Sequence, residues 1–119
     1  MVAVADLVVT LPLSFGLGRW IAEGDQAGEP WSGEEWGFSL GGARPDIAPG
    51  ERVYVVHNLL LRGYAPLTRL VRDEGRWVLC RGGDAVAVTI DEQIVGFRGW
   101  RRRWWDRSAE RPFPDWRKP

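Results

Sequence analysis

The segment Trp100-Arg101-Arg102-Arg103-Trp104-Trp105 places three guanidinium groups between three indoles. Arginine binds phosphate through paired hydrogen bonds and also stacks on flat rings. Tryptophan presents a π-face to a nucleic-acid base or to a neighbouring cation. The segment therefore indicates a surface that contacts nucleic acid. An alternative interpretation is a strand whose tryptophans enter the core while its arginines face water, and the segment alone does not decide between the two.

The distribution of charge also indicates an anionic partner for this end of the chain. The chain carries 16 basic and 16 acidic residues, so its formal net charge is zero. Residues 1–97 hold 8 basic and 13 acidic residues, whereas residues 98–119 hold 8 basic and 3 acidic residues. Such an asymmetry of sign favours an anion as the partner of the basic end. Eight tryptophans are more than a small core requires, so we expect several of them to line a cleft.

Composition limits the class of protein. A chain of 119 residues suits one domain with its own core. No apolar run approaches the roughly 20 residues of a membrane-spanning helix, and no signal peptide is recognisable at the start. The single cysteine, Cys80, cannot form an internal disulfide, and no group of residues has the spacing of metal ligands. We expect a cytoplasmic protein without a metal, a cofactor or a membrane contact.

Turn signals divide the chain into a short helix and several strands. Ser14 is a suitable cap for a helix over Phe15–Glu23, which Gly24 would end. Runs rich in β-branched residues predict strands over 6–11, 52–56, 60–71, 76–80, 85–90 and 94–104. Within the third of these, Gly63 predicts a bulge or a close approach of another backbone. This pattern predicts a mainly β fold with one or two short helices (α+β), arranged as a small β-barrel.

The domain is expected to cover residues 1–107, with a proline-rich tail over 108–119 that is extended or frayed. Before the central strands, residues 25–49 contain many glycines and prolines and are too irregular for a long element. So long a loop in a small domain is usually functional. Its candidate site residues are Trp31 and Trp36, which could stack a base, and Glu29, whose carboxylate could bind the polar edge of that base.

The stretches Ile47–Val56 and Leu61–Leu67 resemble the central hairpin of PUA-like domains, in the ASCH and EVE branches of that superfamily. Upstream, the ASCH pattern Gly-x-Lys-x-x-Glu-x-Arg is matched by Gly24 and Glu29 at the same spacing. The chain departs from that pattern at two positions: Gln26 replaces the lysine and Trp31 replaces the arginine. The resemblance covers roughly residues 7–104.

This resemblance implies a PUA-like β-barrel whose cleft lies between the first helix, the loop that follows it and the barrel wall. Members of the superfamily bind RNA or modified bases, and some ASCH proteins hydrolyse acylated cytidines or cut RNA. The family hydrolases use the lysine as a base, and a threonine near Thr10 acts as their nucleophile. Because Gln26 cannot replace that base, the resemblance favours binding over hydrolysis.

Catalytic candidates remain as alternatives to binding. Glu29 could act as a general base if burial raised its pKa. His57 titrates near neutral pH, and Thr10 and Ser14 carry hydroxyl groups at the turn between the first strand and the helix. Each also has a structural interpretation. Glu29 would be a solvated loop acid, and His57 would be a histidine at a strand end. Thr10 would end the first strand, and Ser14 would cap the helix.

The sequence therefore predicts a nucleic-acid-binding domain for RNA or for a single-stranded or modified base held in a tryptophan-lined cleft. Intact duplex DNA is a less suitable partner. The alternatives are an ASCH-type hydrolase, either a nucleoside amidohydrolase or a ribonuclease, and a protein-interaction domain. The residues expected to bind nucleic acid are Glu29, Trp31, Trp36, Arg101, Arg103 and Trp104.

Overall fold

The computed structural model describes residues 6–10, 36–40, 44–81 and 86–113. The strands of this part of the chain are β1 (Leu7–Thr10), β2 (Trp36–Leu40), β3 (Arg52–His57), β4 (Leu60–Asp73), β5 (Arg76–Arg81), β6 (Val88–Thr89), β7 (Trp100–Arg102) and β8 (Arg111–Pro112). One turn of 3-10 helix, η3, covers Arg107–Ala109. The helix expected over Phe15–Glu23 lies outside the described residues.

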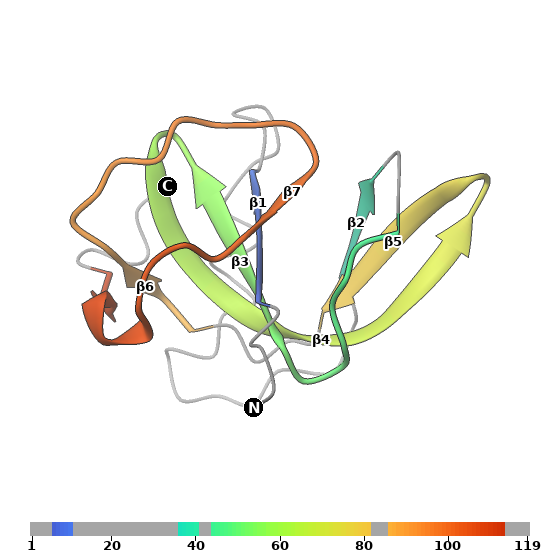
Figure 1. Cartoon of the computed structure of the whole chain (residues 1–119), viewed down its shortest axis with the longest axis horizontal. Coiled ribbons are helices and arrows are strands. Elements are labelled where there is room, and N and C mark those ends of the chain that lie inside the picture. Colours follow the sequence, from blue (N-terminus) through green and yellow to red (C-terminus); the bar gives the residue numbers. More distant parts are fainter. Residues whose placement is uncertain (1–5, 11–35, 41–43, 82–85, 114–119) are drawn as a thin grey trace.

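The main sheet curls into a half-barrel (Figure 1). In the described part of the chain its six strands follow the order β2-β5-β4-β3-β1-β7, so β2 and β7 are the edges. Neighbouring strands are antiparallel, except that β1 and β3 are parallel. β6 and β8 form a separate antiparallel pair. The mainly β architecture expected from the sequence is confirmed.

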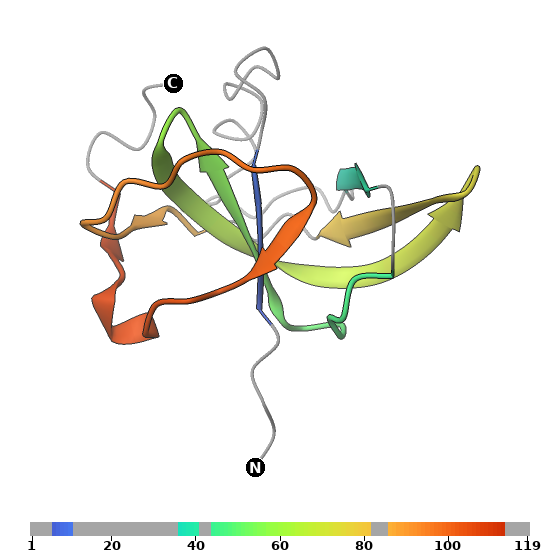
Figure 2. The ribbon, with the colours of Figure 1, turned by 45° about the horizontal axis from the view of Figure 1, so that its top comes forward.

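The long strand β4 gives the sheet its curl. It pairs with β3 along its first half and with β5 along its second half, and it sweeps across the whole molecule (Figures 1 and 2). Its ladders shift register at Arg62 and again at Thr68, and an extra residue at such a bulge bends a strand and increases its twist.

Gly63 lies beside the first bulge, and its backbone has a φ of +152°. A Cβ added there would lie 2.3 Å from the carbonyl oxygen of Val86. Only glycine fits this approach, so the bulge and the close contact predicted from the sequence are both confirmed.

Strands β1 and β3 are covered on both faces, as is usual for parallel strands. Alternate residues of each strand therefore enter two different cores. The inner core, inside the curl, contains Leu7, Val9, Leu40, Ile47, Val53, Val55, Ala65, Leu67 and Leu79. The outer core, between the sheet and the C-terminal segment, contains Val8, Tyr54, Val56, Leu61, Ile90, Ile94 and Trp105.

The last strand of the main sheet is shorter than predicted. Of residues 94–104, only Trp100–Arg102 forms a ladder. The residues before it turn away, with a φ of +74° at Gly99, and the Phe97 N–H donates to Thr10 Oγ1 at 3.2 Å. Gly99, in the left-handed region, interrupts the extended run. The residues before it therefore leave the ladder and cover the end of β1.

Of the described part of the strand predicted over 85–90, residues 88 and 89 form β6. Its partner is β8, which lies in the segment that the sequence predicted to be an extended or frayed tail. Just before that segment, Asp106 caps η3 by accepting a hydrogen bond from the Ser108 N–H. Hydrogen bonding reaches as far as the Phe113 N–H, which donates to the Ala87 carbonyl.

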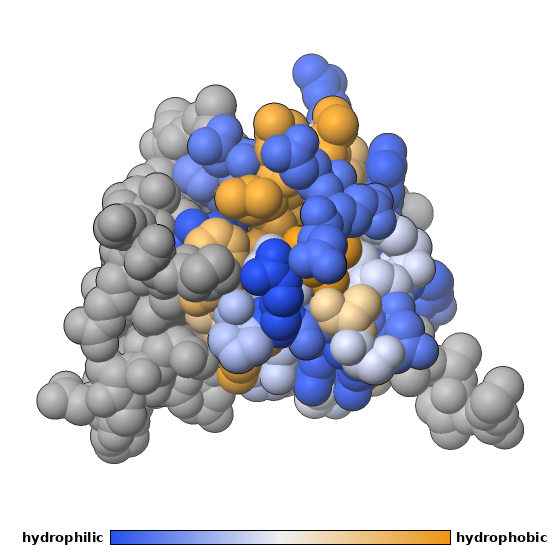
Figure 3. Space-filling model, turned by 90° about the vertical axis from the view of Figure 1, so that its left-hand side faces the viewer, coloured by the Kyte–Doolittle hydropathy of each residue, from blue (hydrophilic) through white to orange (hydrophobic). Residues whose placement is uncertain are grey.

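The β3–β4 hairpin ends in a tight turn with exposed apolar side chains. Asn58 and Leu59 have φ values of +51° and +68°, as in a type I′ turn. Leu59, Leu60 and Val95 are exposed, and the Ile94 N–H donates to the Leu59 carbonyl, which brings the two segments together. Figure 3 views the molecule from the left-hand side of Figure 1 and shows apolar side chains gathered toward the top of that face.

Candidate functional site

The arginine-rich segment begins in β7, at one edge of the sheet. Arg101 pairs with Val8, so it lies on the outer face with the residues of the outer core. Trp100 and Arg102 lie on the inner face, where Trp100 packs against the inner core. Arg101 and Arg102 therefore point to opposite faces, as the alternation of side chains along a strand requires.

Arg103 is bound to a buried carboxylate. The Asp6 side chain is fully buried, and its Oδ2 accepts from Arg103 Nε at 3.1 Å and from Arg107 Nη2 at 2.8 Å. Its Oδ1 accepts from the Arg52 N–H at 2.9 Å. Arg103 also donates to the Trp105 carbonyl, and its side chain is only 13% exposed. These contacts join the start of β1 to the segment that follows β7.

The hydrogen bonds to Asp6 favour its ionised form. Burial by itself raises the pKa of a carboxylic acid. The hydrogen bonds from the Arg52 N–H, Arg107 and Arg103 outweigh burial, so the pKa of Asp6 is lowered. Arg103 is thus neutralised by Asp6, and its departure would remove one of the two arginines that balance this buried carboxylate. Arg103, which the sequence predicts to bind nucleic acid, is therefore paired within the fold, and its role in binding stays a prediction.

Trp104 and Arg101 form an exposed aromatic and cationic surface beside Phe97. The Arg101 guanidinium lies 4.4 Å from the Phe97 ring centroid. Trp104 is 44% exposed, and its ring meets Phe97 and Trp105 edge to face at centroid distances of 6.4 and 5.1 Å. Its indole N–H donates to both carboxylate oxygens of Glu92, at 3.4 and 3.3 Å. The indole is therefore held in position while close to half of its surface faces solvent.

A second arginine–tryptophan cluster lies on the inner side of the half-barrel. Arg72 and Trp77 face each other across the β4–β5 ladder. The Arg72 guanidinium lies 5.2 Å from the Trp77 ring centroid, and the Arg44 guanidinium lies 5.6 Å from the same ring. Both arginines are exposed. A cation within about 6 Å of an indole centroid is attracted to its face. The Trp77 ring therefore helps to hold both guanidinium groups in place.

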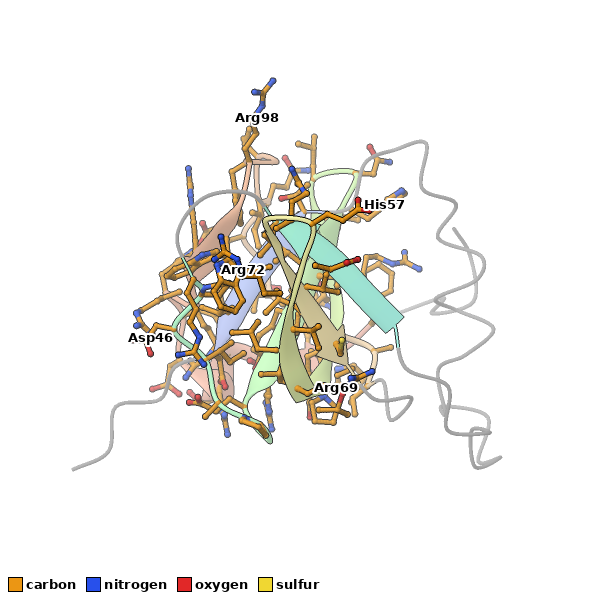
Figure 4. The ribbon with its side chains drawn as sticks, turned by 90° about the vertical axis from the view of Figure 1, so that its right-hand side faces the viewer. Asp46, His57, Arg69, Arg72 and Arg98 are labelled. Atoms are coloured by element: carbon orange, nitrogen blue, oxygen red, sulfur yellow. The ribbon has the colours of Figure 1, made fainter. Side chains whose placement is uncertain are left out.

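The segment that carries Arg44 connects this cluster to β7. Two residues further on, Asp46 Oδ2 accepts from Arg102 Nη2 at 2.6 Å. Arg102 in turn lies 6.0 Å from the Trp100 ring centroid. Ile47 anchors the segment in the inner core. Figure 4 shows Asp46 and Arg72 on the same side of the molecule. We name Arg44, Arg72, Arg102, Trp77 and Trp100 the arginine ridge.

A buried network around Glu110 fixes the C-terminal segment to the outer face. Glu110 Oε2 accepts from the Tyr54 hydroxyl at 2.6 Å and from Trp105 Nε1 at 2.9 Å, and Oε1 pairs with Arg52 at 3.3 Å. The Glu110 side chain is 7% exposed. Burial, followed by the bond to Glu110, raises the pKa of Tyr54 above its ordinary value. The network is structural, since its polar atoms bind one another.

The described catalytic candidates do not converge. Thr10 pairs with Val56, so it shares a face with that residue, whereas the next residue along β3, His57, belongs to the opposite face. The Thr10 hydroxyl oxygen accepts from the Phe97 N–H. In Figure 4 His57 lies well away from Asp46 and Arg72. A hydroxyl nucleophile needs a base within hydrogen-bond reach, and His57 is not placed to act as the base for Thr10.

Ser14, Glu29 and Trp31 lie outside the described residues. Trp36 is the first residue of β2, and its backbone pairs with Arg81. The tryptophan-lined cleft that the sequence predicts around this loop therefore stays a prediction.

Some site residues were missed by sequence reasoning, although two signals for them exist. The turn signal at residues 73–75 fixes the β4–β5 register and could have placed Arg72 opposite Trp77. The charged residue Asp6, directly before the apolar strand β1, could have indicated a buried partner for one of the arginines. No local signal points to Glu92 or Arg44, because their contacts join distant parts of the chain.

Comparison with family models, with curated protein sequences and with solved structures finds no match to this chain. In the part of the chain that the structure describes, no group of three or more histidine, cysteine or acidic side chains could hold a metal ion. Among the same residues, no helix combines the length and the apolar character that crossing a membrane requires.

Proposed function

We propose that this protein is a nucleic-acid-binding domain that takes RNA or another single strand. One observation carries the proposal: four exposed arginines, Arg44, Arg72, Arg101 and Arg102, each lie over an aromatic ring. The rings direct guanidinium groups whose N–H donors suit phosphate oxygens. Exposed indole surface at Trp104 adds the stacking platform that single-strand binding uses.

The arginine ridge provides a track for a phosphodiester backbone. Its residues come from β4, β5, β7 and the segment at residues 44–47, so the cations extend across the inner side of the half-barrel. The acidic side chain on this track is Asp46, which is 79% exposed and pairs with Arg102. An exposed ion pair contributes only about 0–1 kcal/mol. A phosphate could therefore replace Asp46 as the partner of Arg102 at small cost.

We also propose that the half-barrel is the wall of a PUA-like barrel. The two stretches that resemble the PUA-like hairpin include β3 and the first half of β4, which are neighbouring antiparallel strands. In that fold Glu29, Trp31 and Trp36 would provide a base-binding cleft, as the sequence predicts. The hydrolase alternative gains no support from the placement of Thr10 and His57.

A salt titration of binding to a short oligouridylate, followed by fluorescence anisotropy, tests the proposed function. Binding of the wild type should weaken steeply between about 0.05 and about 0.2 M salt. Replacing Arg72 or Arg102 with alanine should weaken binding and reduce the log–log salt slope by roughly 0.7 for each lost phosphate contact. Asp46→Asn should strengthen binding, because it removes the competitor of the phosphate for Arg102.

The matched control for these variants is Arg111→Ala. Arg111 is an exposed arginine, paired with the exposed Asp91 at 3.0 Å, and it lies in β8 rather than on the ridge. Its loss should leave the salt slope unchanged. Equal losses in Arg72→Ala and Arg111→Ala would mean that only net charge matters, and the absence of salt-dependent binding in the wild type would refute the proposed function.

The second candidate function is a protein-interaction domain, which the exposed side chains of Leu59, Leu60 and Val95 favour. Apolar residues at a protruding hairpin are typical of a protein contact. Sedimentation of the protein alone at rising concentration tests self-association through this patch. If Val95→Asp abolishes a self-association that the wild type shows, while no nucleic acid binds, this candidate replaces the first.

A further inference from the structure

We propose that Trp104 and Glu92 form a guanine-selective site, in which a guanine base stacks on the exposed indole and donates two hydrogen bonds to the carboxylate. This inference rests on the proposed function, since the base would belong to the bound single strand. It adds a base preference that a phosphate track by itself cannot provide, because phosphate contacts carry no sequence information.

The geometry of the site comes from the indole and its neighbours. Trp104 is 44% exposed, and the edge-to-face contacts with Phe97 and Trp105 keep its ring from rotating away. Its N–H donates to both oxygens of Glu92, which places the carboxylate at the rim of the ring. A base that lies on the indole face would have this carboxylate beside its edge, and a rotation of the exposed Glu92 side chain would bring both oxygens into the plane of the base.

The chemistry of the carboxylate selects among the bases. An ionised glutamate accepts hydrogen bonds and donates none, and it has further lone pairs beyond those that the indole N–H uses. The Watson–Crick edge of guanine has two adjacent donors, N1–H and the N2 amino group. Adenine and cytosine present one donor beside an acceptor, and uracil presents one donor between two acceptors. Only guanine offers both oxygens of Glu92 a donor without opposing lone pairs.

Arg101 provides the phosphate contact that this base requires. Its guanidinium lies 4.4 Å from the Phe97 ring centroid, and Phe97 is also an edge neighbour of Trp104. The cation and the platform thus share one aromatic support on the outer face of β7. A nucleotide on Trp104 would have a cation close to its own backbone, next to the edge strand that leads to the arginine ridge.

The test compares short oligouridylates that carry one central guanine, adenine or cytosine. For the wild type, the guanine oligomer should bind about tenfold more tightly than the others, the order of effect expected for a bidentate base contact. Glu92→Gln should remove this preference, and any change in the binding of plain oligouridylate should be no larger than the change in Asp91→Asn, which removes the same charge. Trp104→Ala should weaken binding of all these oligomers, because the stacking surface is lost.

Asp91→Asn is the matched control for Glu92→Gln. It makes the same change of charge in the adjacent residue, whose carboxylate pairs with Arg111 rather than with an indole. It should keep the full preference for guanine. Both variants alter exposed side chains, so thermal unfolding should show that each still folds.

The outcomes separate this inference from the proposed function. Steep salt-dependent binding with no preference for guanine would overturn the guanine site and leave the nucleic-acid function standing. A titration with guanosine monophosphate gives an independent result. If it binds with dependence on Glu92 while no oligonucleotide binds, the base site stands and the proposed function fails; if neither ligand binds, both are refuted.

Discussion

Replacing Asp6 with asparagine should lower the free energy of unfolding by about 3–6 kcal/mol. Asparagine can still accept the hydrogen bond from the Arg52 N–H, but it carries no charge to pair with Arg103 and Arg107. The two arginines then differ, because the Arg107 side chain is 44% exposed and can bind water, whereas the Arg103 side chain is 13% exposed and has little access to water. The loss of one partner of a buried pair costs about 3–5 kcal/mol, and the half-exposed pair adds at most about 1 kcal/mol.

The loss should depend on pH in a defined direction. The pKa of Asp6 in the folded protein is lowered below its ordinary value of 3.8. Its stabilising effect is therefore fully present above that value and is lost as the pH falls through the folded pKa. Urea unfolding should give a constant difference between wild type and Asp6→Asn from about pH 5 to about pH 8, and the difference should shrink as the wild-type carboxylate becomes protonated.

Asp46→Asn is the control, because Asp46 and Arg102 form an exposed pair of the same chemical type. Its cost should stay below about 1 kcal/mol. The reasoning is refuted if Asp6→Asn costs no more than Asp46→Asn, or if the difference between Asp6→Asn and wild type grows on acidification. Either result would mean that Arg103 is free to leave Asp6, and Arg103 would again be available to bind phosphate.

Four further substitutions test other parts of the fold by urea or thermal unfolding. Gly63→Ala should cost about 2–3 kcal/mol, because a Cβ there meets the Val86 carbonyl at 2.3 Å in a backbone conformation that suits glycine; a neutral effect would contradict the close approach. Leu59→Gly should raise stability by up to about 1 kcal/mol, since it removes a φ of +68° from an exposed leucine; a large loss would show that the leucine side chain is needed. Glu110→Gln should cost about 2–3 kcal/mol through its buried hydrogen bonds, and no loss would mean that the C-terminal segment adds no stability. Because the pKa of Tyr54 is raised above 10.0, stability should also fall as the pH rises above that value, and Tyr54→Phe should remove this alkaline loss.

Local patterns predicted the elements whose geometry depends on neighbouring residues. The β-branched runs at residues 52–56 and 76–80 form β3 and β5, and the glycine at position 63 marks the bulge. The same kind of pattern overestimated the strands at 85–90 and 94–104, where apolar side chains pack into the outer core without a full ladder. It also missed β2, because the glycines around Trp36–Leu40 conceal a strand that forms on the edge of β5.

The sequence by itself determined that this chain is mainly β, and the alternation of side chains along a strand puts Trp100 and Arg101 on opposite faces. Which arginines remain available was decided by tertiary structure. Asp6 is 97 residues from Arg103, and Asp46 is 56 residues from Arg102, so no local pattern reveals that the first pair is buried and the second exposed. A guanidinium next to a buried carboxylate anchors the fold, whereas the same group over an exposed ring is available to a ligand, and only the packing of distant strands makes that difference.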